Sequence, residues 1–166
     1  YKNKNGEEFD GTHESGYPQT HTVGANTTLK RATKTGYTFD GWFINSDCSG
    51  SAIETLGAES YTSDITLYAK WSINSYTVSF DLQGHGSAIQ DQTVQYGGKV
   101  TQPNAPSEAG FTFGGWYTEE QCSNAWDFAN HTVSGNTILY AKWTDIRTVV
   151  TLSAENMSIE VNILEQ

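Results

Sequence analysis

The chain has 166 residues, 36% of them hydrophobic and 13% aromatic, and its 9 Lys and Arg against 19 Asp and Glu give a net charge of −10. This charge argues against binding to a nucleic acid or to an anionic membrane surface, because both would repel the chain. No stretch approaches the roughly 18 consecutive apolar residues of a membrane span, which argues against direct membrane insertion, and the many Gly, Thr, Ser and aromatic residues favour short strands over helices.

The first half of the chain contains one incomplete and two clearer predicted elements. Only Tyr1 to Asn5 come before Gly6, so we expect the first strand to be cut short and its edge to be weak. Gly36–Phe43 reads Gly-Tyr-Thr-Phe-Asp-Gly-Trp-Phe, a segment dense in aromatic residues. Ile65–Trp71 predicts a closing strand with apolar residues on both faces.

The second half of the chain opens with a clearer strand. From Tyr76 to Gln83 every second residue is apolar, which is typical of a strand with one buried face. Val94–Tyr96 predicts a shorter strand, and Gly97-Gly98 suits the tight turn that follows it. At Gly115-Trp116 a Gly beside a bulky Trp lets the chain bend so that the indole reaches the core. Thr137–Trp143 predicts the closing strand.

Two motifs occur twice in the chain, in the same order. Gly36–Phe43 is matched position by position by Gly110–Tyr117, and Leu67–Trp71 recurs unchanged as Leu139–Trp143. Chance does not produce two such matches in a short chain, so the sequence predicts an internal duplication.

The duplication divides the chain into three predicted parts. Residues 1–72 form a first repeat that is truncated at its N-terminal side, residues 73–143 a second repeat, and residues 144–166 a tail. In the tail, apolar and polar residues alternate from Met157 to Ile163, which predicts a strand. We expect either the start of a further module or an extra strand docked on the second repeat.

The motif G-[YF]-T-F-x-G-W-[FY], followed by L-Y-A-K-W, resembles the Listeria-Bacteroides repeat, or internalin B-type repeat, of bacterial surface proteins. The match is strong over Gly36–Trp71 and Gly110–Trp143, and Tyr17–Gly24 and Ile89–Gly97 lie where the family has its second strand. The resemblance implies a mostly β (α+β) fold of two tandem β-grasp, ubiquitin-like modules, each a four-stranded sheet with at most a short helix. Where the family has a Gly-containing loop, Glu119–Cys122 predicts a helical turn instead.

The residue types that perform catalysis or bind metals are scattered along the chain. The histidines have no partner at a fixed spacing, and they are His13, His21, His85 and His131. There is no Ser-His-Asp order and no GxSxG motif, and Asp81–Gly86 has too few acidic residues for an EF-hand. Cys48 and Cys122 lack a zinc spacing and could form a disulfide only between the repeats. We therefore expect no enzyme, no metal site and no cofactor.

The aromatic residues are the candidates for both core and binding. One group recurs at motif positions in both copies, which indicates a structural role in a small core: Trp42, Trp71, Trp116 and Trp143. Trp126 stands near the position of Ile53 in the first copy, and is either a core substitution or an exposed contact. Tyr68 and Tyr140 lie on the strand face opposite Leu and Trp, so they and Trp126 are the predicted ligand contacts, unless a loop covers this face.

Two functions of different classes fit these observations. The first is a non-catalytic spacer or stalk of a secreted or cell-surface bacterial protein, whose modules contact their neighbours in the chain and hold other domains away from the cell wall. The alternative is an adhesive, virulence-associated module that binds a host protein or a glycan through exposed aromatic residues or a sheet edge. An exposed aromatic patch would favour adhesion, and buried Trp side chains under a polar surface would favour the spacer.

Overall fold

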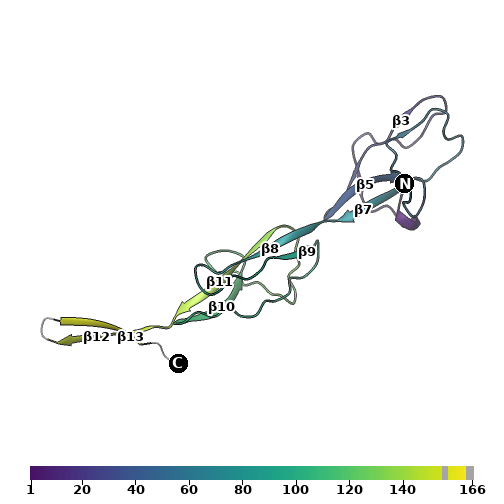
Figure 1. Ribbon diagram of the computed structural model, residues 1–166. Coiled ribbons are helices and arrows are strands. Elements are labelled where there is room, and N and C mark those ends of the chain that lie inside the picture. Colours follow the sequence, from purple (N-terminus) through teal and green to yellow (C-terminus); the bar gives the residue numbers. More distant parts are fainter. Residues whose placement is uncertain (155–156, 164–166) are drawn as a thin grey trace. The chain divides into compact units, whose positions relative to one another are not determined.

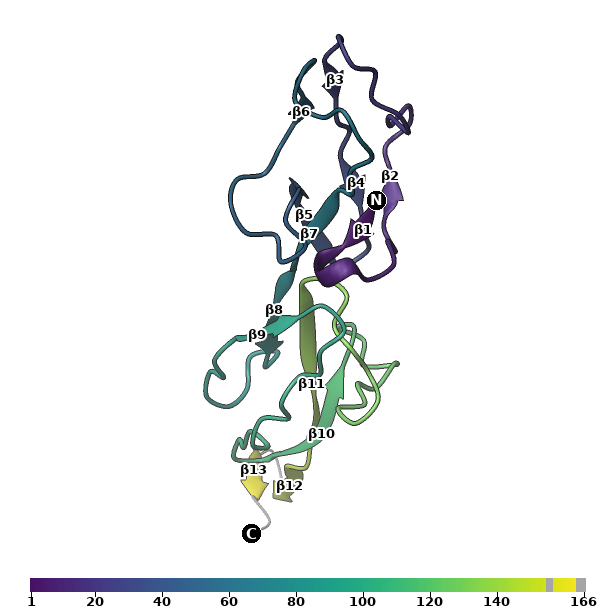
Figure 2. The same cartoon turned by 90° about the vertical axis from the view of Figure 1, so that its right-hand side faces the viewer.

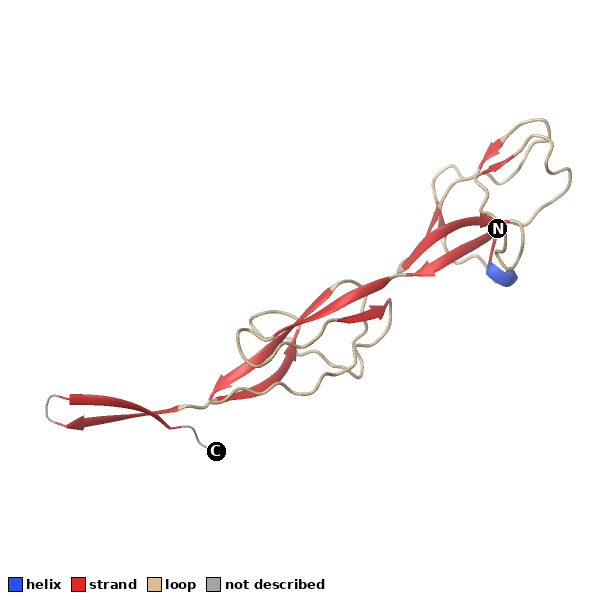
Figure 3. Cartoon of the chain, in the orientation of Figure 1, coloured by secondary structure: helices blue, strands red, loops and turns tan. Residues whose placement is uncertain are grey.

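The computed structural model describes residues 1–154 and 157–163, and its regular elements are almost all strands, joined by long loops (Figures 1 and 3). The chain divides into two compact units, Tyr1–Asn74 and Ser75–Gln166. The elements of the first unit are β1 (Lys2–Asn3), the 3-10 helix η1 (Lys4–Gly6), β2 (Thr12–His13), β3 (Thr27–Thr28), β4 (Ala32–Thr33), β5 (Tyr37–Phe43), β6 (Thr55–Leu56) and β7 (Tyr68–Ile73). Those of the second unit are β8 (Ser75–Asp81), β9 (Gln92–Gln95), β10 (Phe111–Tyr117), β11 (Thr137–Asp145), β12 (Thr148–Ala154) and β13 (Met157–Ile163). The predicted mostly β fold is confirmed.

The second unit contains a four-stranded sheet in the order β10-β11-β8-β9 (Figure 2). β8 runs parallel to β11, with Val78 opposite Thr137 and Phe80 opposite Leu139, whereas the two outer pairs are antiparallel. The first and last strands of this sheet along the chain are therefore neighbours in its middle. This is the strand order of a β-grasp module.

The apolar side chains that alternate with polar ones along β8 form one side of the core of the second unit. Val78 is fully buried and Phe80 is 8% exposed, whereas Thr77 before them and Asp81 after them are exposed. The buried residues of this core are Val78, Phe80, Val100, Trp116, Val133, Leu139 and Ala141. A Val or Leu side chain buried in this way contributes about 1.5–3 kcal/mol to stability.

A bulge interrupts the long antiparallel pair of both units at the same motif position. The register between β10 and β11 shifts between Phe113 and Trp116, and that between β5 and β7 shifts between Phe39 and Gly41. Gly115 has a φ of 107° and Gly41 a φ of 126°, which side chains with a Cβ rarely adopt. The Gly that precedes each Trp thus lets the strand bend, as the motif predicts.

The first unit has a smaller sheet, in the order β1-β7-β5, and departs from two predictions. The closing strand predicted to begin at Ile65 begins at Tyr68, and Tyr17–Gly24, the predicted second strand, contains no strand. The reason is the same in both cases. A strand needs a partner for its backbone groups, and among the described residues neither segment pairs with a neighbouring strand: β1 pairs with β7 only through Lys2 and Asn3.

The structure of the loop after β10 differs from a third prediction. Glu119–Cys122 forms a turn and no helix, closed by a 3.0 Å bond from the Cys122 N–H to the Glu119 carbonyl. Cys122 has a φ of 51°, a left-handed conformation in which a right-handed helix cannot continue. In the first unit the Cys48 N–H bonds the Asn45 carbonyl at 2.9 Å, and Cys48 has a φ of 55°. The two units therefore share this turn despite their different sequences.

The predicted strand-forming tail consists of two strands. β12 pairs with β13 in antiparallel register, from Thr148 opposite Ile163 to Ala154 opposite Met157. Among the residues described, these strands form their own two-stranded sheet and do not extend the four-stranded one. Residues 155–156 and 164–166 of the predicted tail lie outside the described part of the chain.

Candidate functional site

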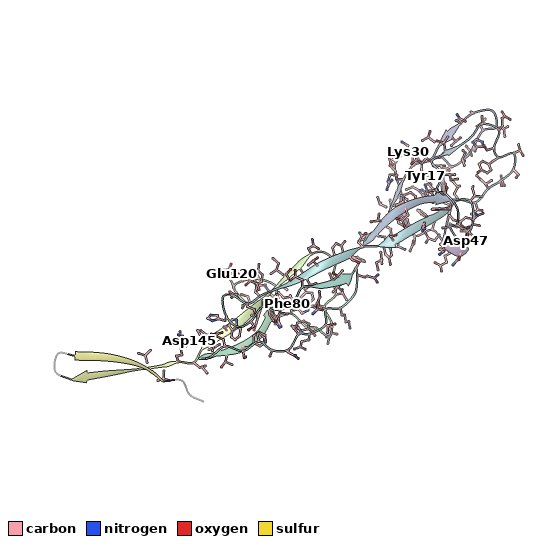
Figure 4. All side chains as sticks on the ribbon, in the orientation of Figure 1. Tyr17, Lys30, Asp47, Phe80, Glu120 and Asp145 are labelled. Carbon is pink, nitrogen blue, oxygen red and sulfur yellow. The ribbon has the colours of Figure 1, made fainter. Side chains whose placement is uncertain are left out.

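Two of the motif Trp residues lie at the centre of the two cores. Trp42 is 2% exposed and Trp116 is 3% exposed. The Trp42 indole Nε1 donates a 2.7 Å hydrogen bond to the carbonyl of Lys30, which is labelled in Figure 4. Trp116 contacts Phe80 edge-on, with ring centroids 5.0 Å apart. These two positions are structural, and neither indole is accessible to a ligand.

The other two motif Trp residues connect the closing strand to the end of the first strand of each unit through a hydrogen bond. Trp71 donates from its Nε1 to the side-chain oxygen of Asn3 at 3.0 Å, and Trp143 donates to the carbonyl of Leu82 at 2.9 Å. Both indoles are half-buried and pack against the core of their own unit. Their positions within each unit are therefore equivalent, down to the segment that accepts the hydrogen bond.

Trp126 occupies the position that Ile53 has in the first unit. The Trp126 N–H bonds the carbonyl of Trp116, and the Ile53 N–H bonds that of Trp42, both at 2.8 Å. The Trp126 side chain is half-buried, packs against the core and meets His131 edge-on at 4.9 Å. Packing of this kind agrees with a core substitution, and a role of Trp126 in binding stays a prediction.

The two candidate tyrosines have equivalent places in the two sheets. Tyr68 on β7 lies opposite Phe43, and Tyr140 on β11 lies opposite Tyr117, so each is part of an aromatic cross-strand pair. Both are half-buried. Tyr68 belongs to the first unit and Tyr140 to the second. The predicted contacts therefore do not all lie at one site within a single unit.

A groove in the first unit was not predicted from the sequence. It has a volume of about 520 Å³ and lies between residues 18–23 on one side and residues 61–65 on the other, with Tyr1, Leu56 and Leu67 completing it. Polar and apolar side chains contribute to its lining in similar measure. His21 on one wall bonds Thr27 through Nδ1 at 2.9 Å, while its Nε2 is buried without a partner among the described residues. This groove is therefore a candidate site of the first unit.

A smaller hollow in the second unit has a volume of about 330 Å³ and is lined by residues that include Gln83, His85 and Trp143. The Gln83 side-chain amide beside it donates to the Ala141 carbonyl at 2.9 Å and to the Glu120 carbonyl at 3.1 Å. Its donors are thus already engaged within the unit.

A family model decides the relationship that the motifs suggest. The model of the Listeria-Bacteroides repeat domain matches this chain twice, over residues 2–70 and over residues 76–142. The chain belongs to the Listeria-Bacteroides repeat family. Two tandem repeats of this family are therefore present, and the resemblance seen in the sequence is confirmed.

Relatives of the two Listeria-Bacteroides repeats occur in much longer proteins. Internalin H of Listeria monocytogenes is 40% identical over 127 residues, which cover 74% of this chain and 22% of internalin H. A protein of Evansella cellulosilytica, provisionally named a membrane protein, is 44% identical over 113 residues, covering 66% of this chain and 16% of its own length. The chain thus spans less than a quarter of the length of either relative.

The described part of the two repeats contains two cysteines and scattered histidine and acidic side chains. No group of three or more His, Cys, Asp and Glu side chains comes together there to hold a metal ion. Cys48 and Cys122 are free thiols, and burial raises the pKa of the Cys48 thiol. Within the same described residues, no helix has the length and apolar character to span a membrane.

Proposed function

We propose that these two repeats act as a non-catalytic spacer in a bacterial surface protein and hold other domains at a distance from the cell. The parallel pairing of the first and last strands supports this most strongly. Because β8 and β11 run in the same direction, the chain enters the second unit at one end of the sheet and leaves it at the other. A module of this kind adds its own length to the protein that contains it.

The length gained can be estimated from the register. Val78 lies opposite Thr137, β8 begins at Ser75, and β11 continues to Asp145. At about 3.3 Å per residue, the second unit separates its entry from its exit by roughly 35 Å. β1 and β7 are likewise parallel in the first unit, with Lys2 opposite Tyr68.

The surface supports the spacer over aromatic adhesion. Every Phe, Tyr and Trp of the chain is buried or half-buried. The large hydrophobic side chains that the described residues expose are all aliphatic, namely Val23, Ile44, Ile138, Ile146 and Val149. Aromatic rings are the usual anchors of protein and sugar recognition, and none of them is fully exposed here.

The relatives support a location at the surface of a bacterium. One of them is an internalin and another carries a membrane-protein name. Adhesion to a host protein or a glycan is the alternative function, with Tyr68, Tyr140 and Trp126 as its predicted contacts.

A reach assay distinguishes the two functions. The whole chain is inserted between a cell-surface anchor and a reporter domain, and access of a large soluble ligand to the reporter is measured. The controls are no insert and an unrelated repeat array of equal length. A spacer predicts that the chain and the unrelated array restore access equally.

The same cells are then exposed to a panel of host proteins and glycans. Binding that saturates, and that is lost in Tyr68→Ala, Tyr140→Ala or Trp126→Ala variants that remain folded, would replace the spacer by an adhesive module. Ile138→Thr serves as the matched control, because Ile138 is an exposed side chain next to Tyr140 on the same strand.

A further inference from the structure

The two units differ in how the edge strand of the sheet is covered, which is β5 in the first unit and β10 in the second. The Gly110 carbonyl accepts the N–H of Ile146, just after β11, at 3.0 Å. The next residue, Phe111, instead donates to the Glu108 carbonyl at 3.1 Å. Since backbone groups alternate in direction along an antiparallel strand, the N–H and C=O of Phe113 also point away from β11. No described residue bonds either of these two groups.

In the first unit, three side chains cover the matching edge. Phe39 has the place of Phe113, and its carbonyl accepts a 3.2 Å hydrogen bond from the Arg31 guanidinium. Asp40 adds an exposed charge on the strand itself. A Cβ at the bulge glycine would lie only 2.6 Å from the side chain of Ala52, so a neighbouring segment crowds this position. Charged and close-packed side chains of this kind prevent an edge strand from pairing with another chain.

The second unit lacks the equivalent cover. When the two copies of the motif are aligned, Ala105 stands in the place of Arg31. Gly114 stands in the place of Asp40, and both Ala105 and Gly114 are exposed. Among the described residues, a Cβ at the bulge glycine of this unit would have only the ring of Tyr117 within reach, at 3.8 Å. The edge of β10 is therefore open where that of β5 is closed.

The open part of β10 is short. A backbone bridge at Phe111 closes it at one end, and the bond from the Trp126 N–H to the Trp116 carbonyl at 2.8 Å closes it at the other. A strand that lies beside residues 112–115, between these two points, can bond both outward groups of Phe113. Two of these four residues are glycines, which lets a second backbone approach closely.

The charge around this edge indicates the occupant. Between Lys99 and Lys142 the sequence has no Lys or Arg, and its acidic residues there are Glu108, Glu119, Glu120 and Asp127. This stretch contains β10 and the segments on both sides of its open edge. The surroundings stay acidic when Lys142 and the ion pair of Arg147 with Asp145 are counted as well. A peptide that carries Lys or Arg is therefore attracted to this edge, and an acidic one is repelled.

We propose that the open edge of β10 binds one short, extended peptide strand that carries Lys or Arg side chains. The peptide backbone bonds Phe113 and adds a strand to the four-stranded sheet, and the basic side chains meet the acidic surroundings. This interaction is separate from the spacer function and does not depend on it.

Titration of the whole chain with synthetic peptides, followed by NMR, tests the proposal. The probe is the peptide Thr-Lys-Val-Lys-Thr. One matched control, Thr-Glu-Val-Glu-Thr, reverses the charge, and the other, Thr-Lys-Pro-Lys-Thr, keeps the charge but lacks the central N–H. The shifts and the hydrogen exchange of the backbone amides of residues 111–115 are measured.

The Lys-Val-Lys peptide is expected to shift the Phe113 amide in a saturable way, to slow its exchange, and to bind about tenfold more tightly than either control. No saturable shift at residues 111–115 would overturn the proposal, as would equal binding of the three peptides. Protection of the Phe113 amide that rises with protein concentration, without any peptide, would overturn it in favour of pairing between two copies of the chain.

A double variant closes the edge without changing the net charge. Ala105→Arg with Gly114→Asp copies the first unit and should weaken binding at least about tenfold. A Cβ at Gly114 would lie 3.3 Å from the flexible side chain of Lys142, so the fold should be retained. The matched control is Gln95→Arg with Thr93→Asp, two exposed positions of β9 at the opposite edge of the sheet, and it should bind as the natural chain does. Equal binding by the two double variants would overturn the proposal.

Discussion

The indole of Trp42 donates its hydrogen bond to the carbonyl of Lys30 at 2.7 Å, and the matching indole of Trp116 has no acceptor among the described residues. The two matching Trp residues therefore differ in whether the indole N–H has a hydrogen-bond acceptor. Because a satisfied donor stabilises a fold and an unsatisfied buried donor destabilises it, the same substitution should have unequal effects in the two units.

We expect Trp42→Phe to destabilise the first unit by about 2–3 kcal/mol, since it removes both buried volume and a hydrogen bond. Trp116→Phe should cost the second unit about 1 kcal/mol less, because it also removes an unpaired donor. Denaturant unfolding followed separately for each unit by NMR measures both losses. A larger loss for Trp116→Phe would show that its indole has a partner that the structure does not contain.

The bulge glycines provide a second matched pair. A Cβ at Gly41 would lie 2.6 Å from the Cβ of Ala52, whereas a Cβ at Gly115 would lie 3.8 Å from the nearest atom, on the ring of Tyr117. Both substitutions strain a positive φ, at a cost of about 1–3 kcal/mol, but only Gly41→Ala adds a clash. We expect Gly41→Ala to be the more destabilising in thermal unfolding.

Ala52→Gly separates the clash from the strain. In the double variant Gly41→Ala, Ala52→Gly the close contact is gone, so its destabilisation should fall to that of Gly115→Ala. If the double variant is no more stable than Gly41→Ala alone, backbone strain explains the whole effect.

The loop after β10 should make the second unit sensitive to acid. The Glu119 carboxylate accepts the Thr118 hydroxyl at 2.5 Å and the N–H groups of Ser123 and Asn124 at 2.6 Å, and these bonds, that of Thr118 foremost, lower its pKa to about 2. A pKa below that of the unfolded chain means that the ionised carboxylate stabilises the fold above about pH 4.5. This stabilisation is lost as the pH falls from there towards 2.

The melting temperature of the Glu119→Gln variant should therefore depend less on pH, between pH 4.5 and pH 2, than that of the natural chain. Asp145, whose pKa the Arg147 side chain lowers to about 2, titrates in the same window and remains in both proteins. Parallel melting curves over this range would mean that the Glu119 bonds do not form in solution.

His13 should make the first unit sensitive to milder acid. Its ring stacks on that of Tyr17, with centroids 3.9 Å apart and an interplanar angle of 9°, and burial among these rings lowers its pKa. The fold therefore favours the neutral ring, and the unfolded chain binds more protons just below the unperturbed pKa of about 6.5. Stability of the first unit should fall as the pH drops below that value.

We expect the melting temperature of the first unit to be lower at pH 5.5 than at pH 7.5, and His13→Phe, which keeps a ring to stack on Tyr17, to remove most of this difference. If the melting temperature of the second unit changes with pH in the same way, the effect belongs to groups other than His13.

Local sequence patterns predicted the parts of the fold that depend on local chemistry. Alternation identified β8, and the Gly before Trp116 identified the bend that became a bulge at Gly115; Gly41 holds the matching bulge in the first unit. The patterns failed at Ile65–Leu67 and Tyr17–Gly24, where the residues suit a strand but the structure offers none to pair with. A strand depends on a neighbour that a local pattern cannot reveal.

The groove was missed because its two walls, residues 18–23 and residues 61–65, come together only in the folded chain. No local pattern brings these two segments together. The candidate contacts Tyr68 and Tyr140 were chosen by strand face, and Trp126 because the first copy has Ile53 near its position. A strand pattern does not show which face a loop or a neighbouring strand covers.

The parallel pairing of β8 with β11 also determines how the protein would respond to tension. A pull along the chain would act at Ser75 and Asp145 and so parallel to the strands, which loads the hydrogen bonds between them in shear and requires them to break together. The β12–β13 hairpin, whose ends Thr148 and Ile163 are neighbours, would instead open one pair at a time. The second unit should therefore resist a higher force than the hairpin, so a stretched chain would lengthen in steps.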